Sequence, residues 1–135
     1  MSATENKQLL RDVFDAWATG DLRPLLAAMG DDVAWTLTGH NSWSATYRGK
    51  DAVRHELLAP LGKQFADTYT STASRFVAED DVVVVETRGR VTTKAGPRYD
   101  NKYCFVFRLE GGKIREITEY LDTQLVAEVL TDPAR

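Results

Sequence analysis

The clearest pattern in the chain is a two-residue alternation between Tyr99 and Leu109. The odd positions are aromatic, aliphatic or amide, whereas most of the even positions are charged. Side chains of a strand point alternately to its two faces, so this pattern predicts a strand with one buried face. That face carries an amide, Asn101, and a phenol, Tyr103, among phenylalanines. An unpaired polar group in a core costs about 1–3 kcal/mol, which favours a face that lines a pocket for a polar ligand.

Three more runs of strand-forming residues accompany this one, over residues 68–79, 82–93 and 114–122. The links between them are short, and Gly111-Gly112 is typical of a hairpin turn. Neighbouring strands with such short links run antiparallel. The second half of the chain is therefore predicted to be an antiparallel meander.

Helical spacing dominates the first half of the chain. Ser2 and Glu5 fit a capping box, Asp21 fits an N-cap, Gly30 fits a helix-ending left-handed residue, and Pro60 predicts a break or kink. The predicted elements are helices over 2–17, 22–29 and 50–65, a strand over 32–38, a loop over 39–49, and a last helix over 123–130 capped by Asp122. Helices followed by a meander predict a single α+β domain over residues 1–135, with the helices covering one face of a curved sheet.

Composition narrows the range of functions. The chain has 135 residues, 43% of them hydrophobic and 27% charged, with a net charge of −3. The sequence has no basic cluster that could bind along a phosphate backbone, and it has no apolar run long enough to span a membrane. Neither nucleic acid nor a membrane is therefore an expected partner. A single cysteine, Cys104, excludes an internal disulfide, and a cytoplasmic protein is expected. The two histidines, His40 and His55, lack metal-ligand spacing, so no metal or other cofactor is implied.

Glu119 is the main catalytic candidate. It shares a strand face with Ile117 and Leu121, which places it on the apolar side. Burial raises the pKa of a carboxyl group, and such a group suits general acid or base chemistry near neutral pH. The alternative is a salt bridge with a strand arginine at the rim of the sheet.

Four other side chains are weaker candidates. Glu86 and Arg88 share one face of a strand that is apolar on both sides, so they either form an acid–arginine–acid cluster with Glu119 or lie in solvent. His40 follows the first strand and either overhangs the cavity mouth as a proton shuttle or is exposed and idle. Trp35 is either core or a platform for a ligand.

The order of these elements is accompanied by the stretches WATGDLRPLLAAMGDDVAW, TYRGKDAV, GGKI and EYLD. Together they resemble the nuclear-transport-factor-2-like superfamily, and within it the SnoaL-like and ketosteroid-isomerase-like group, from about Asn6 to Leu130. The resemblance implies a cone-shaped fold in which the sheet wraps a long helix around a deep apolar cavity, and a homodimer formed through the sheet. The superfamily includes isomerases, cyclases, hydrolases, dehydratases and non-catalytic transport factors, so the fold alone does not settle the function.

Two groups of enzymes in the superfamily can be compared with this chain residue by residue, and the first is the ketosteroid isomerases. Val13 stands where ketosteroid isomerases carry their oxyanion tyrosine, Leu37 stands at their aspartate base, and Cys104 or Phe105 stands at their second acid. These groups are missing, so the resemblance does not extend to a true ketosteroid isomerase.

Limonene-epoxide-hydrolase-like enzymes fit better. Glu119 falls at one of their catalytic aspartates. Glu86 and Arg88 fall near their arginine and their other aspartate, with the charges exchanged.

We therefore predict an acid/base enzyme that isomerises, cyclises, dehydrates or hydrolyses an apolar oxygenated metabolite. Glu119 carries the proton, and Asn101, Tyr103 and His40 orient the ligand. The alternative is a carrier or sensor with the same cavity and no catalysis. A third hypothesis is that the sheet serves mainly as a protein-interaction surface. The charged even-numbered face of residues 98–110 disfavours it.

Overall fold

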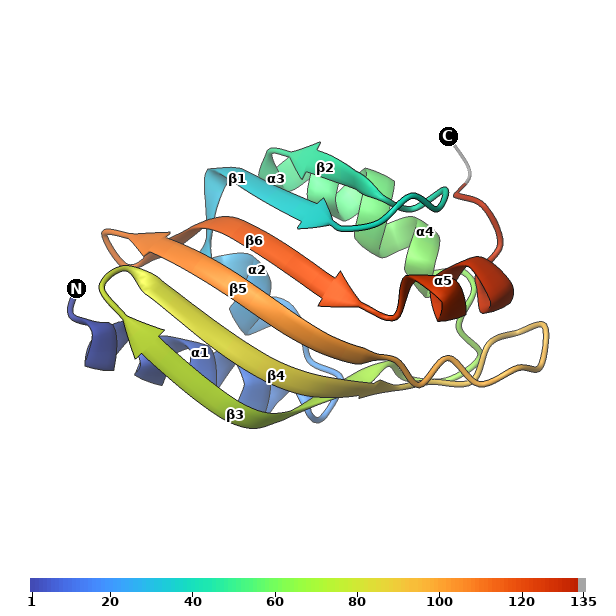
Figure 1. Cartoon of the computed structure of the whole chain (residues 1–135), viewed down its shortest axis with the longest axis horizontal. Coiled ribbons are helices and arrows are strands. Elements are labelled where there is room, and N and C mark those ends of the chain that lie inside the picture. Colours follow the sequence, from blue (N-terminus) through green and yellow to red (C-terminus); the bar gives the residue numbers. More distant parts are fainter. Residues whose placement is uncertain (134–135) are drawn as a thin grey trace.

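A computed structural model describes residues 1–133 and shows an α+β fold in which a curved sheet carries helices on one face (Figure 1). Within these residues the sheet has six strands in the order β2-β1-β6-β5-β4-β3. The strands are β1 (Met29–Leu37), β2 (Ala45–Arg48), β3 (Thr70–Glu79), β4 (Val82–Arg90), β5 (Lys102–Glu110) and β6 (Lys113–Leu121). The helices are α1 (Ala3–Trp17), α2 (Arg23–Ala28), α3 (Lys50–Ala52), the π-helix η1 (Val53–Leu58), α4 (Ala59–Gly62) and α5 (Thr123–Val129).

The sheet confirms the predicted meander and adds two strand pairings to it. β3, β4, β5 and β6 are consecutive antiparallel neighbours. β1 pairs with β6 in parallel, which local sequence patterns did not indicate. β2 lies inside the segment predicted as a loop, and it pairs with the end of β1. The parallel pairing has a functional consequence, because it puts Trp35 beside Ile117 and Leu37 beside Glu119.

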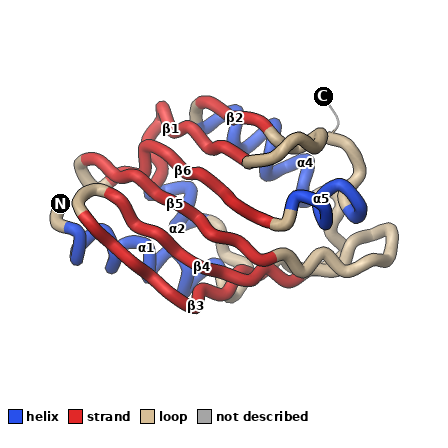
Figure 2. Tube along the Cα trace, viewed as in Figure 1, coloured by secondary structure: helices blue, strands red, loops and turns tan. Residues whose placement is uncertain are grey.

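The long helix α1 begins as predicted. Ser2 is its N-cap, and the reciprocal bonds with Glu5 of a capping box are present at 3.0 and 3.1 Å. Its buried face packs against β3 and β4, and Phe14 also contacts the rings of Phe105 and Phe107 in β5. Figure 2 shows α1 and α2 on the same side of the sheet. These contacts fix the inner wall of the molecule.

The second helix differs from its prediction at both ends. Leu22 is the N-cap of α2, while the carboxylate of Asp21 accepts a bond from the backbone N–H of Arg23 and pairs with its guanidinium. Gly30 is not a left-handed helix end, because the chain turns extended at Met29 and Gly30 already belongs to β1. The expected cap and terminator were therefore wrong.

The third predicted helix is interrupted. It runs as α3, η1 and α4 and ends at Gly62 rather than at residue 65. Pro60 lacks an N–H group and cannot complete the regular helical ladder, which agrees with a wider π-helical turn directly before it. Phe65 instead forms an isolated bridge with Thr93. The irregularity predicted at Pro60 is therefore found in the π-helical turn before it, and the chain stays helical through Pro60 itself.

The C-terminal helix α5 has the predicted cap. One carboxylate oxygen of Asp122 accepts bonds from the backbone N–H groups of Gln124 and Leu125, each at 3.1 Å. α5 follows β6 directly and lies at the end of the sheet (Figure 1). Among residues 1–133, no helix is both long and apolar enough to cross a membrane.

Candidate functional site

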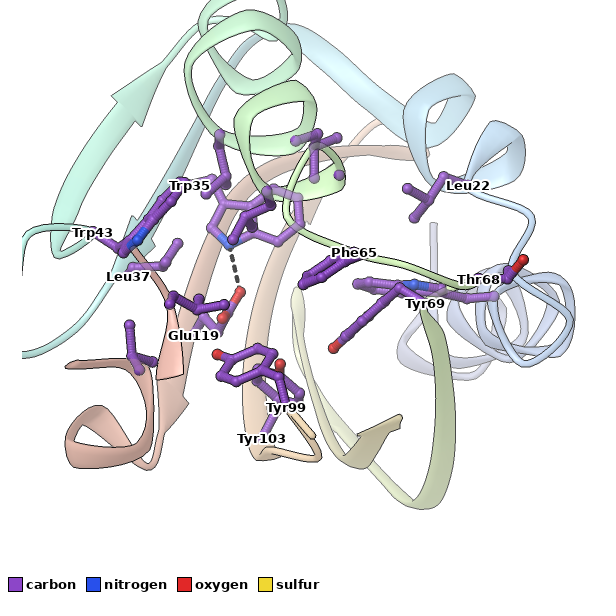
Figure 3. A pocket seen from close by; sticks show the side chains of 18 of the residues that line it. Leu22, Trp35, Leu37, Trp43, Phe65, Thr68, Tyr69, Tyr99, Tyr103 and Glu119 are labelled. Carbon is purple, nitrogen blue, oxygen red and sulfur yellow. Dashed lines mark hydrogen bonds between the residues drawn. The ribbon is translucent and has the colours of Figure 1, made fainter. Parts of the chain in front are cut away.

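A cavity of about 230 Å³ lies between the concave face of the sheet and the helices (Figure 3). Its walls are mainly apolar and aromatic, and they include three tryptophans and three tyrosines, Trp17, Trp35, Trp43, Tyr69, Tyr99 and Tyr103. Among the described residues of its lining, Asp67 and Glu119 carry carboxyl groups, and none is a lysine, arginine or histidine. Such a cavity suits a small uncharged molecule.

Glu119 is the polar centre of this cavity. It lies in β6 between Leu37 of β1 and Phe105 of β5, and only 7% of its surface is exposed. The indole Nε1–H of Trp35 donates a hydrogen bond of 3.0 Å to its Oε1 (Figure 3). The strand phase read from the sequence therefore placed this side chain on the correct face.

Burial raises the pKa of Glu119 to about 8. The hydrogen bond from Trp35 opposes this shift, because it stabilises the carboxylate, but its effect is smaller than that of desolvation. Glu119 is therefore mostly protonated at neutral pH. A carboxylic acid in this state can donate a hydrogen bond or a proton to a ligand oxygen.

Three tyrosine hydroxyls accompany the carboxyl group. Tyr99 and Tyr103 lie on the side of Glu119 away from Trp35, and Tyr69 reaches the cavity from the start of the β3 region (Figure 3). Burial raises the pKa of Tyr99 to about 12, and it also raises those of Tyr69 and Tyr103 well above the usual value. These hydroxyls stay neutral under ordinary conditions and act as hydrogen-bond donors or acceptors.

Tyr69 depends on a glycine opposite it. Gly89 in β4 is buried, and a Cβ atom at this position would collide with the Tyr69 hydroxyl. The absence of a side chain at Gly89 therefore leaves the space that this hydroxyl occupies. Stacking of the Tyr69 ring on Phe65, with ring centroids 5.5 Å apart, fixes the ring from the other side.

Asn101 has a different place from the one expected. It is buried, but it does not line the cavity. Its Oδ1 accepts bonds from the backbone N–H groups of Lys102 and Asp122 at 2.8 and 3.1 Å. Its Nδ2 donates to the Asp122 carbonyl and to the Tyr99 hydroxyl, both at 3.1 Å. The amide is thus fully paired and holds Tyr99 and the start of α5 in place.

Glu86 and Arg88 point away from the cavity. The inward side chains of β4 are Val83, Val85 and Thr87, which leaves the alternate positions on the convex face. Glu86 pairs there with Arg75, and this ion pair lowers its pKa. The acid–arginine–acid cluster with Glu119 therefore does not exist.

His40 is exposed in the loop after β1 and is not part of the cavity lining. The loop folds onto itself and onto α5 through Asn41, whose side chain donates to the Thr123 carbonyl at 3.3 Å. His40 itself stays in solvent. The structure thus brings together Glu119, Trp35 and Tyr103 of the predicted site, and leaves out Asn101, Glu86, Arg88 and His40.

Several site residues were missed by sequence reasoning. Tyr99 was recognised as inward-facing but was not assigned to the site, and Trp17 was read only as part of the first helix. Tyr69 falls within the strand predicted over residues 68–79, but β3 begins only at Thr70, so the two-residue alternation does not fix its direction. The signal that could have found them is the concentration of aromatic residues at the ends of predicted elements.

The chain matches the family model described as "SnoaL-like domain" over residues 10–117. It belongs to this family. An uncharacterised protein of Mycobacterium tuberculosis, Rv0034, is 27% identical over 123 residues, which cover 89% of this chain and 91% of that protein. The superfamily expected from the sequence motifs is thereby confirmed.

Solved structures agree with this assignment. An NTF2-like protein of unknown function from Burkholderia pseudomallei is 26% identical with a TM-score of 0.80, covering 97% of this chain and 99% of its own. An LEH-like epoxide hydrolase from Mycobacterium tuberculosis is 21% identical with a TM-score of 0.72, covering 95% and 90%. The first supports the NTF2-like cone, and the second shows similarity of fold.

Proposed function

We propose that this protein is an acid/base enzyme acting on a small, uncharged, oxygenated molecule, with Glu119 as the proton carrier. The observation that carries the proposal is a buried carboxyl group that faces an apolar cavity and receives a hydrogen bond from Trp35. Two neighbouring hydroxyls, those of Tyr99 and Tyr103, provide polar contacts that hold a ligand oxygen without changing charge.

The proton balance of the reaction follows from this geometry. The neutral Glu119 donates its proton to a carbonyl, hydroxyl or epoxide oxygen of the substrate. The carboxylate that results accepts the Trp35 N–H bond and takes a proton back from the activated molecule or from an added water. The net result is isomerisation or cyclisation, dehydration if water leaves, or hydrolysis if water enters.

The fold similarity to an LEH-like epoxide hydrolase supports hydrolysis as one of these outcomes. Glu86 and Arg88, which the resemblance placed near the arginine and the other aspartate of such enzymes with the charges exchanged, lie on the convex face. A single neutral carboxyl group is better suited to protonating an oxygen than to activating a water as a base. We therefore favour isomerisation, cyclisation or dehydration over hydrolysis.

Three uncharged probes distinguish these reactions: 3-cyclohexen-1-one for isomerisation, 4-hydroxy-4-phenyl-2-butanone for dehydration and styrene oxide for hydrolysis. We expect turnover of at least one probe by the natural protein. Glu119→Gln keeps the side-chain shape and removes the acidic proton, so it abolishes turnover while affinity stays within about tenfold, or roughly 1.4 kcal/mol. Glu116→Gln, which alters an exposed carboxyl group paired with Arg108, is the matched control and retains turnover. Undiminished turnover in Glu119→Gln overturns the proposal.

A second candidate function is a carrier or sensor that binds its ligand without converting it. One observation favours it. Among the described residues of the cavity lining, the only other carboxyl group besides that of Glu119 belongs to Asp67, which is exposed. In this case Glu119→Gln lowers affinity and there is no activity to lose. The same three probes and two variants therefore separate the two functions.

We also propose that the protein forms a homodimer through the convex face of the sheet. Val77 and Tyr120 are 54% and 51% exposed on this face, and the register aligns Val77 with Val84 and Tyr120 with Cys104. An exposed apolar strip of this kind is typical of an interface. Light scattering at micromolar concentration is expected to give twice the mass of the 15.1 kDa chain, and a monomer contradicts the proposal.

A further inference from the structure

Trp17 carries a polar group whose place in the structure is still unexplained. It lies in the last turn of α1, is 4% exposed and lines the cavity. Its Nε1–H has no hydrogen-bond partner among the described residues. The other two tryptophans of the cavity are paired, Trp35 with Glu119 and Trp43 with the Thr131 carbonyl at 2.9 Å. Buried indole N–H groups usually have a partner, so the free group on Trp17 needs an explanation.

The Trp17 ring is held firmly by its neighbours. It stacks on Phe14 with ring centroids 5.3 Å apart. Its centroid also lies 6.1 Å from that of Tyr69 and 5.8 Å from that of Phe105. Phe105 also contacts Trp35, with ring centroids 6.3 Å apart. The indoles of Trp17 and Trp35 therefore both pack on Phe105, at two separate positions in the cavity wall.

We propose that Trp17 is a ligand-binding residue whose Nε1–H donates a hydrogen bond to a second acceptor oxygen of the substrate, remote from the oxygen that meets Glu119. This inference rests on the proposed function, and it narrows the substrate to uncharged molecules with oxygen acceptors at two ends. An indole N–H can donate a hydrogen bond but cannot accept one. It therefore pairs with an acceptor oxygen of the ligand and not with a hydroxyl proton.

The charge of the cavity also restricts which ligands it can bind. The described lining residues contain no cation, and its buried carboxyl group is that of Glu119. A carboxylate or phosphate on the ligand would lose its hydration without gaining a counter-charge. A carbonyl oxygen needs only one donor, and Trp17 supplies it. A neutral diketone therefore has the required chemistry.

Two probes of the same shape test the inference. 1,4-Diacetylbenzene has an acceptor at each end, whereas 4-isopropylacetophenone replaces one carbonyl with an apolar group of similar size. Calorimetry gives the affinity ratio of the two probes for the natural protein and for Trp17→Phe, which keeps an aromatic ring and removes the N–H. We expect the ratio to fall about fivefold to tenfold in Trp17→Phe.

Trp43→Phe is the matched control. It removes an indole N–H from the same cavity, but that group is already bonded to the Thr131 carbonyl, which also receives a bond from Gln64. The affinity ratio is expected to stay within twofold of the natural value. If both probes bind and the ratio is the same in all three proteins, the role of Trp17 is overturned while the proposed cavity function stands. If neither probe binds, the proposed function fails together with this inference.

A second readout does not depend on the stability of Trp17→Phe. Labelling the indole nitrogens with ¹⁵N gives one N–H resonance for each tryptophan, and Trp43→Phe together with Trp35→Phe assigns that of Trp17 by elimination. Hydrogen bonding to 1,4-diacetylbenzene is expected to move the Trp17 proton resonance downfield, and 4-isopropylacetophenone is expected to move it less. Equal shifts with both probes contradict the inference.

Discussion

Replacing Glu119 by glutamine is expected to change how the stability of the protein depends on pH. The substitution keeps the length and planar shape of the side chain, and its amide oxygen can still accept the hydrogen bond from Trp35. It removes the one feature that matters for this prediction, which is a buried group that titrates. A comparison of the two proteins therefore isolates the cost of ionising Glu119.

The sign and size of the effect follow from the pKa. Burial raises the pKa of Glu119 from an ordinary value of 4.5 to about 8, so the folded protein binds more protons than the unfolded chain between these two values. The contribution of Glu119 to stability is fully present below pH 4.5 and is lost as the pH rises through 8. Each pKa unit corresponds to about 1.4 kcal/mol, which makes the total loss up to about 5 kcal/mol.

Urea unfolding at several pH values between 5 and 9 measures this loss. We expect the difference in unfolding free energy between the natural protein and Glu119→Gln to change between pH 5 and 8, by as much as about 1.4 kcal/mol per pH unit, to the disadvantage of the natural protein, and to level off above pH 8. Carboxyl groups with a lowered pKa, such as Glu86 and Asp21, lose their stabilising effect only in acid and are common to both proteins.

Glu116→Gln serves as the control for this experiment. Glu116 lies on the same strand, but its carboxylate is exposed and bonded to Arg108 at 3.0 Å, and this bond lowers its pKa. Its removal should leave the slope between pH 5 and 9 unchanged. If Glu119→Gln and the natural protein show parallel curves over this range, Glu119 is not a buried acid and the reasoning is refuted.

Two further predictions concern residues that the structure moved out of the predicted site. Asn101→Leu leaves the backbone groups of Lys102 and Asp122 without their partner, so it should lower the unfolding free energy by more than about 2 kcal/mol in urea titrations, and a variant as stable as the natural protein contradicts this role. His40→Ala removes an exposed side chain, so it should leave both stability and any turnover within twofold of the natural values, and a large loss of activity would return His40 to the site.

The buried face of the sheet was largely predictable from the sequence. The odd positions from Tyr99 to Leu109 are all buried, as their alternation with polar neighbours indicated. The same two-residue phase placed Glu119 inside, because Ile117 shares its face. Local phase is sufficient here, since a strand with one buried face reveals that face in its own residues.

Partners distant in sequence could not be predicted in this way. An amide such as that of Asn101 is the kind of group that can bind a ligand in a pocket. Its hydrogen-bond partner Asp122 is 21 residues away, and this bond is visible only in the folded chain. The direction of Arg88 was open because both faces of its strand contain apolar residues. The short strand β2 was hidden in a turn-rich segment, and the parallel pairing of β1 with β6 depends on the whole sheet.

The most direct test of a buried proton carrier is a titration of the Glu119 carboxyl group itself. Glutamate labelled with ¹³C at the side-chain carboxyl carbon gives one resonance per residue, and its absence in Glu119→Gln identifies the resonance of Glu119. The structure predicts a transition at a pH of about 8, well above the ordinary value of a glutamate carboxyl group. A transition below pH 5 would mean that this carboxyl group is solvated and ionised in the folded protein, and it would contradict the proposed role of Glu119.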